Sequence, residues 1–205
     1  MSASLKHLAA RLRSDDPDER ALALGELIEQ GAAATPVLLA ALDDPNAAVR
    51  ALAAEGLGLT GDAASADRLA AALADGDGKV RSNAAAALAR LGDPRAVDAL
   101  IRTLDDNYDL LRAHLTQSAY ALMGMGPSVL PAVAPLLQHE NERIRTQAQW
   151  IINWVVSQQQ AGDWSGLQAL MADYAPDGPP AERERVAEAV TAWLRHAPPA
   201  EADDA

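Results

Sequence analysis

The sequence predicts an all-α solenoid of stacked antiparallel helix pairs. Two ladders with one common period carry this prediction. Arginines recur at spacings of 30, 31, 31 and 33 residues, at Arg20, Arg50, Arg81, Arg112 and Arg145. Apolar L-x-x-x-L pairs keep the same period, at Leu8/Leu12, Leu38/Leu42, Leu69/Leu73, Leu100/Leu104 and Val133/Leu137. A fixed period of about 31 residues is typical of repeat proteins, in which one unit is too small to bury its apolar face alone.

Each repeat is predicted to consist of a helix, a turn and a second helix. Alanine-rich stretches after the arginines place apolar residues at helical spacing, as at Val80, Ala84, Ala87, Leu88 and Leu91. Such a spacing forms one apolar stripe along a helix. An N-cap acceptor before a proline predicts helix starts at Asp16-Pro17, Thr35-Pro36, Asp44-Pro45 and Asp93-Pro94. Left-handed helix ends are predicted at Gly31, Gly61, Gly92 and Gly124.

These elements are expected to form a single array over residues 1–197. The expected order is an N-terminal capping helix within 1–14, four repeats at 15–43, 44–74, 75–105 and 106–138, a divergent fifth repeat at 139–175 and a C-terminal capping helix at 181–197. Terminal caps with a polar outer face are needed in such arrays. Residues 198–205 are rich in proline and acids and are predicted to form a disordered tail.

The composition is acidic and lacks cysteine. The 17 Lys and Arg against 29 Asp and Glu give a net charge of −12, which disfavours a nucleic-acid partner. Without cysteine the chain has no disulfide, thiolate metal site or thiol nucleophile, which is compatible with a reducing cytosol. No apolar run reaches the roughly 18 residues of a membrane span, and no secretion signal is visible. We therefore expect a soluble, cytoplasmic monomer that does not contact a membrane.

Two segments carry a resemblance to a known family. Asp43–Gly58 reads DDPNAAVRALAAEGLG, and Lys79–Leu100 reads KVRSNAAAALARLGDPRAVDAL. Both resemble the short HEAT-like repeat that is also found in phycobilin lyase subunits, and the match covers about residues 15–157. The resemblance implies an armadillo-like, right-handed superhelix whose second helices line the concave side. It also implies that partner contacts lie mostly on that side, and that most members are scaffolds or adaptors.

No catalytic or metal site is predicted. The four histidines, His7, His114, His139 and His196, lie in four different units without a partner at helical spacing. His139-Glu140 resembles the His-Glu pairs of the iron-binding HEAT-type hydroxylase of deoxyhypusine, but that family repeats the pair on several helices. No G-x-S-x-G motif and no glycine-rich phosphate loop occurs. We therefore expect no catalysis, no cofactor and no metal.

The arginine ladder has two interpretations. Guanidinium groups at a regular rise could form a phosphate-binding stripe for a polyanion. Alternatively, each arginine pairs with acids between neighbouring repeats, and the candidate acids are Asp44, Asp75, Asp77 and Asp106. The acidic charge of the chain favours the structural pairs.

One group of candidate protein-binding residues lies on the second helices. Arg95, Asp98 and Arg102 share a face of the third repeat's second helix, and Asp67 lies on the same face one repeat earlier. The three charges on the third repeat can also pair with one another at i+3 and i+4, so a merely solvated face is the alternative.

A second candidate group is the tryptophan pair Trp150 and Trp154. Both lie outside the predicted core stripe of the fifth repeat's first helix, which is Ile144, Ala148, Ile151, Ile152 and Val155. We expect the irregular segment 161–196 to fold over the two indoles as an enlarged cap. The alternative is an aromatic contact surface for a partner or a flat ligand.

Together these observations predict a non-catalytic scaffold or adaptor that binds another protein on its concave helical surface. Two alternatives stay open. The first is a bilin-lyase-like subunit or chaperone that holds a tetrapyrrole. The second is a HEAT-type alkyl-base DNA glycosylase, against which the acidic charge argues because a DNA-binding domain is usually basic.

Overall fold

The computed structural model describes residues 2–106, 115–159 and 162–196. Within these ranges every regular element is a helix, which confirms the all-α prediction. The chain divides into two compact units, residues 1–107 (unit 1) and residues 108–205 (unit 2), and each is described by itself. Arg112, His114 and the predicted tail lie outside the described residues.

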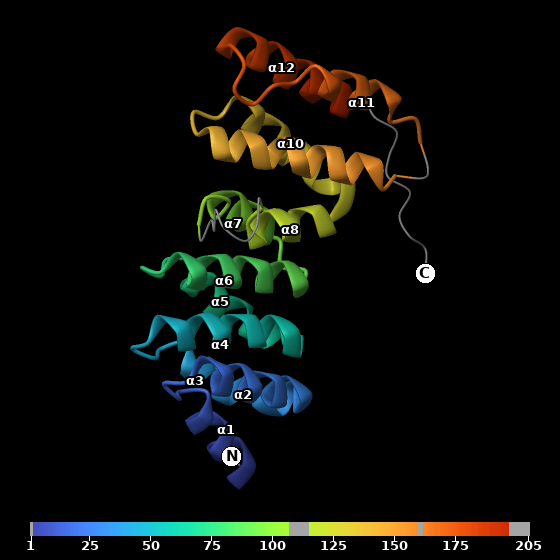
Figure 1. Ribbon diagram of the computed structural model, residues 1–205. Helices are drawn as coiled ribbons and strands as arrows, with labels where there is room; N and C mark the ends of the chain where they lie inside the picture. The colour runs from blue at the N-terminus through green and yellow to red at the C-terminus, as the bar shows by residue number, and fades with distance from the viewer. Residues whose placement is uncertain (1, 107–114, 160–161, 197–205) are drawn as a thin grey trace. The chain divides into compact units, whose positions relative to one another are not determined.

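Unit 1 consists of alternating long and short helices. Its elements are α1 (Ala3–Arg11), α2 (Pro17–Glu29), the 3₁₀ turn η1 (Gly31–Ala34), α3 (Thr35–Ala41), α4 (Ala47–Thr60), η2 (Ala63–Ser65), α5 (Ala66–Ala72), α6 (Gly78–Arg90) and α7 (Ala96–Arg102). In Figure 1 the long helices α2, α4 and α6 follow one another along the unit, and the short helices α3, α5 and α7 accompany them. Each long helix and the short helix after it form one predicted repeat.

Alanine and glycine allow α4 and α6 to pack closely. A Cβ added at Gly58 would lie 2.7 Å from the Cα of Ala87, so the two backbones approach at this point as near as they can. Leu88 is fully buried, and Val80, Ala84 and Ala87 are buried beside it, as the sequence predicted. The side-chain amide of Asn83 donates to the Ala51 carbonyl at 2.8 Å and joins the two repeats.

The helix ends follow local sequence signals only in part, because three of the four N-caps predicted before a proline differ. The N-caps of α3 and α7 are Ala34 and Arg95 and not the predicted Thr35 and Asp93. Asp16 caps α2 as predicted, because its carboxylate accepts from the Asp18 amide at 2.9 Å. The N-cap of α4 is Asn46 and not the predicted Asp44, which instead accepts from the Asn46 amide. Of the four glycines predicted to be left-handed, Gly31, Gly61 and Gly92 have a positive φ, whereas the prediction for Gly124 is wrong. Gly124 is the last residue of α8 (Gln117–Gly124), and Gly126 has the positive φ of 71°.

The first described element of unit 2 is α8, and its second layer is irregular. The elements after α8 are η3 (Gly126–Val129), α9 (Leu130–Val133), η4 (Ala134–Gln138), α10 (Glu142–Ser157), α11 (Ser165–Ala172) and α12 (Pro180–His196). Helix α10 packs against α8, η4 and α11, and α12 packs against η4, α11 and α9. Buried Gln147 accepts from the Thr116 amide at 3.1 Å and so joins α10 to the start of α8, as Asn83 joins α6 to α4. Both residues lie two positions after a ladder arginine.

Aromatic side chains hold the C-terminal part of unit 2 together. The rings of Trp164 and Trp193 lie 5.3 Å apart and tilted, which joins the start of α11 to α12. The hydroxyl of Tyr174 donates to the carbonyl of Leu137. Burial raises the pKa of Tyr174 to about 12, so the hydroxyl keeps the proton that it donates.

No helix in the described part of the chain is long and apolar enough to cross a membrane.

Candidate interaction surface

The ladder arginines join consecutive repeats. The Arg50 guanidinium binds both carboxylate oxygens of Asp75 at 2.8 Å, and Arg81 binds those of Asp106 at 2.8 and 2.6 Å. In each case the remaining nitrogen donates to carbonyls in the loop before the arginine's own helix, such as the Asp44 carbonyl for Arg50. The hydrogen bonds from Arg50 lower the pKa of Asp75. The structural interpretation of the ladder is therefore confirmed at Arg50 and Arg81.

The first and last ladder arginines have other acceptors. Arg20 donates to the carbonyls of Ser14 and Asp15, at 2.8 and 3.1 Å. Arg145 donates to the carbonyl of Pro176 at 2.6 Å and to those of His139 and Glu140 at 2.8 Å. All four described guanidinium groups thus donate to the protein's own oxygens, although the Nε of Arg20 is buried without a partner.

Two of the predicted binding residues link α5 to α7. Arg95, directly before α7, donates to Asp67 of α5 at 3.1 Å and forms two shorter hydrogen bonds with Asp93, at 2.8 and 2.6 Å. The hydrogen bonds from Arg95 lower the pKa of Asp93 to about 2. Arg95 therefore binds mainly Asp93 of its own repeat, and its longer hydrogen bond to the almost fully exposed Asp67 links this repeat to the preceding one.

The other two predicted binding residues on α7 keep their charges available. Asp98 and Arg102 are both exposed and one helical turn apart, but they do not pair with each other. Within the described residues, neither side chain has an ion pair or a hydrogen bond. The expected pairing along α7 is therefore absent, and α7 presents one free acid and one free base.

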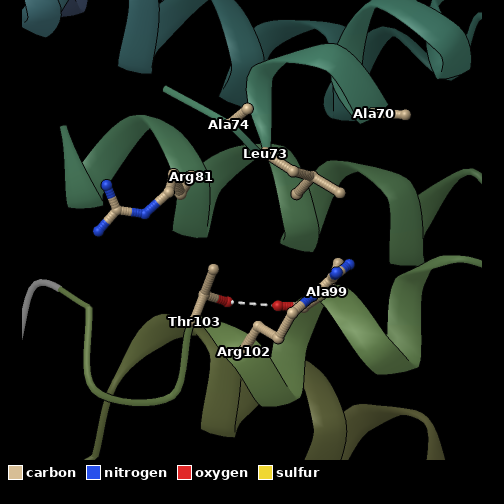
Figure 2. Close-up of a pocket in the computed structure, with 7 residues that line it drawn as sticks. All are labelled: Ala70, Leu73, Ala74, Arg81, Ala99, Arg102 and Thr103. Carbon is tan, nitrogen blue, oxygen red and sulfur yellow. Dashed lines mark hydrogen bonds between the residues drawn. The ribbon is translucent and has the colours of Figure 1, made fainter. Parts of the chain in front are cut away.

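Arg102 borders a pocket of about 360 Å³ between α5 and α7. The lining residues are Ala70, Leu73, Ala74, Arg81, Ala99, Arg102 and Thr103. Figure 2 shows the Arg102 side chain running past Ala99 toward α5, while the Arg81 guanidinium points to the other side. The Thr103 hydroxyl donates to the Ala99 carbonyl of its own helix at 2.9 Å. Apolar lining with one free guanidinium group suits an aliphatic chain that ends in an anion.

Sequence reasoning singled out Arg102 but missed the pocket beside it. Ala70, Ala74 and Ala99 carry no polar group, and a small residue on a helix gives no functional signal by itself. The available signal was a comparison of repeats, since alanines stand at positions 74 and 99 where the preceding repeat has Asp43 and Arg68.

The predicted cap over the tryptophan pair is wrong. Trp150 and Trp154 are 54% and 48% exposed, on the same face of α10 as the exposed Asn153. Residues 162–196 leave both indoles exposed, because α12 packs against η4 and α11 and its own Trp193 pairs with Trp164. Asn153 also borders a pocket of about 220 Å³ between α10 and α11.

The described residues contain no group of three or more His, Cys, Asp or Glu side chains that could hold a metal ion. His139 accepts a hydrogen bond from the Asn141 amide at 3.0 Å, so its ring takes part in the turn before α10. The His139-Glu140 pair therefore lies in a helix-start turn.

Comparison with known proteins supports the repeat architecture. The family model for HEAT repeats matches residues 5–78 and 35–119. The complex of CpcE and CpcF of phycocyanin lyase from Nostoc sp. PCC7120 is similar with a TM-score of 0.52 and 26% identity, covering 91% of this chain and 75% of that chain. A designed armadillo repeat protein in complex with the peptide (KR)4 has a TM-score of 0.46 and 18% identity, covering 94% and 100%. Human deoxyhypusine hydroxylase in complex with glycerol has a TM-score of 0.40 and 18% identity, covering 94% and 96%. No curated protein matches the sequence.

Proposed function

Because the chain belongs to the HEAT repeat family, we propose that it is a non-catalytic scaffold or adaptor that binds another protein. The contact surface is the face formed by α3, α5 and α7, which we call the second-helix face. The observation that carries this proposal is the pocket between α5 and α7 with the unpaired Arg102 at its border. Asp98, free and exposed one turn earlier, supplies a second polar contact on this face.

The exposed pair Trp150 and Trp154 is a second contact surface in this proposal. Half-exposed indoles combine a large apolar area with a polar N–H group, and such residues are enriched at the centres of protein interfaces. Scaffolds commonly hold more than one partner, so the two surfaces need not bind the same protein.

Site-specific photo-cross-linking in the native host tests the second-helix face. A photo-reactive residue is placed at Ala71, which is exposed on α5, and a control residue at Ala21, which is exposed on α2. We expect a discrete covalent adduct from position 71 and none from position 21, with the partner identified by mass spectrometry. Adducts of equal yield from both positions would contradict a specific surface.

The likeness to the phycocyanin lyase complex favours one other function, that of a bilin-lyase-like subunit. In that case the pocket beside Arg102 would bind a propionate of a tetrapyrrole. Adding phycocyanobilin to the purified protein distinguishes the two functions. A scaffold leaves the bilin absorbance and fluorescence unchanged, whereas a bilin-binding subunit shifts the absorbance band and raises the fluorescence.

A further inference from the structure

We propose that the pocket between α5 and α7 receives a single glutamate side chain of the protein partner, with Arg102 as its counter-ion. This inference rests on the proposed scaffold function and specifies the chemistry of the bound segment. It follows from a comparison of two pockets that occupy the same position in consecutive repeats.

The preceding repeat pair contains the equivalent pocket with an internal acid in place. A pocket of about 230 Å³ between α3 and α5 is lined by Leu42, Asp43, Arg68, Ala71, Ala72, Ala74 and Asp75. There Arg68 binds both carboxylate oxygens of Asp43 at 2.8 Å. The fold thus already contains a carboxylate that is bound by an arginine in a pocket lined by alanine and leucine.

Moving 31 residues along the chain changes the charges of this pocket, although most of its lining positions recur. Leu42 corresponds to Leu73, and the ion-paired Asp43 and Arg68 correspond to Ala74 and Ala99. Ala71 of the first pocket corresponds to Arg102 of the second. The second pocket is therefore lined by two arginines, Arg81 and Arg102, and by no acid, and its volume of about 360 Å³ is larger.

Arg102 is the cation that a ligand can use. Arg81 also lines the pocket, but Asp106 and the carbonyls of Asp75 and Gly76 occupy its guanidinium. Arg102 binds none of the described residues, and Thr103 donates its hydroxyl to backbone carbonyls. An incoming carboxylate would therefore gain a charge-assisted hydrogen bond without breaking an existing one.

The shape and charge of the surroundings select glutamate in a particular context. Ala70, Leu73 and Ala99 offer apolar contact for the two methylene groups of a glutamate stem. The net charge of −12 and the exposed Asp98 repel a run of acids. The expected ligand is consequently one glutamate flanked by apolar residues.

Titration of the full ¹⁵N-labelled chain with the peptide acetyl-Gly-Leu-Glu-Leu-Gly-amide tests the inference by NMR. We expect saturable shifts of the Arg102 Nε–H signal and of backbone amides in residues 70–74 and 99–103. Replacing the peptide glutamate by glutamine should weaken binding about tenfold or more, because a charge-assisted hydrogen bond is lost. Arg102→Gln should weaken it to the same extent.

Arg90→Gln is the matched control, because Arg90 is an exposed arginine on α6 and its removal changes the net charge by the same amount. This variant should bind the peptide like the parent. The inference is overturned if the glutamate and glutamine peptides bind equally, if Arg102→Gln retains full binding, or if a lysine peptide binds better than either. If the peptide fails while cross-linking from position 71 still captures a partner, only the glutamate pocket is refuted and the scaffold function stands.

Discussion

Arg13 donates a hydrogen bond to Asp44 at 2.7 Å and so occupies the carboxylate that the repeat register assigns to Arg20. The equivalent acids Asp75 and Asp106 bind Arg50 and Arg81, each 25 residues earlier in the chain. Arg20 lies 24 residues before Asp44, and its Nε is buried without a partner. Arg13, which follows the C-cap residue of α1, therefore replaces the ladder arginine at the first joint, where a joint means the ion pair between an arginine and the acid at the start of the next repeat.

The joint between Arg50 and Asp75 should stabilise the protein in a pH-dependent way. Arg50→Ala should lower the free energy of unfolding at pH 7 by about 1–3 kcal/mol, because a largely buried carboxylate loses its charged donor. The pKa of Asp75 is lowered in the folded state, so this stabilisation is present above the unfolded pKa of about 4 and is lost as the pH falls through the folded pKa. Urea unfolding of parent and variant at pH 7 and pH 3 measures the effect. If parent and variant differed in free energy of unfolding by the same amount at both pH values, the expected pH dependence would be contradicted.

Two glycine-to-alanine substitutions should change the stability of unit 1 in opposite directions. Gly58→Ala should destabilise unit 1 by about 1–3 kcal/mol, because the new Cβ would lie 2.7 Å from the Cα and Cβ of Ala87. Gly25→Ala should stabilise it by about 0.5–1 kcal/mol, since Gly25 lies inside α2 and nothing stands within 4 Å of an added Cβ. Chemical denaturation of both variants provides the comparison. A neutral Gly58→Ala would mean that α4 and α6 are farther apart than described.

Substitutions at Leu88 and Arg90 should distinguish the buried face of α6 from its exposed face. Leu88→Ala should cost about 2–5 kcal/mol, because Leu88 is fully buried. Arg90→Ala should change stability by less than about 0.5 kcal/mol, because Arg90 is exposed two positions away. Thermal melts of the two variants check the assigned register, which would be wrong if both changes were equally mild.

The four tryptophans should fall into two classes. The double change Trp150→Ala and Trp154→Ala should alter the free energy of unfolding by less than about 1 kcal/mol, since both indoles are half exposed. Trp164→Ala should cost about 3–5 kcal/mol, because Trp164 is 7% exposed and packs on Trp193. Chemical denaturation of each variant measures the free energy of unfolding, and acrylamide quenching of tryptophan fluorescence measures the exposure of the indoles. If the double variant unfolded as easily as Trp164→Ala, the exposed face of α10 would be misassigned.

The sequence predicted the elements that depend on local patterns. The repeat period, the stripe of Val80 and Leu88 and the cap at Asp16 arise from residues that lie within a helix or directly before it. The cap over Trp150 was predicted wrongly because it depends on which partner α12 selects, and α12 packs on η4. The sequence could not predict the partner of Arg20 either, because Asp44, which lies 24 residues after Arg20, binds Arg13 instead.

The candidate site was predicted only in part for a related reason. Helical spacing placed the charged residues of α7 on one face, but it did not show that Asp98 and Arg102 stay unpaired. The pocket beside Arg102 depends on how the end of α5 meets α7. Its counterpart becomes recognisable only once Asp43 and Arg68 are known to pair. Contacts between residues 25 or more positions apart leave no periodic pattern in one sequence.

The arginine joints allow this chain to grow by in-frame duplication. Segment 75–105 carries Asp75, the acceptor for the arginine before it, and Arg81, the donor to the acid after it. A second copy inserted after residue 105 would present its own Asp75 equivalent to Arg81 and its own Arg81 equivalent to Asp106. Both joints of the new copy would then be complete without a further mutation. The first repeat cannot be copied in this way, because its joint depends on Arg13, which lies outside the repeat.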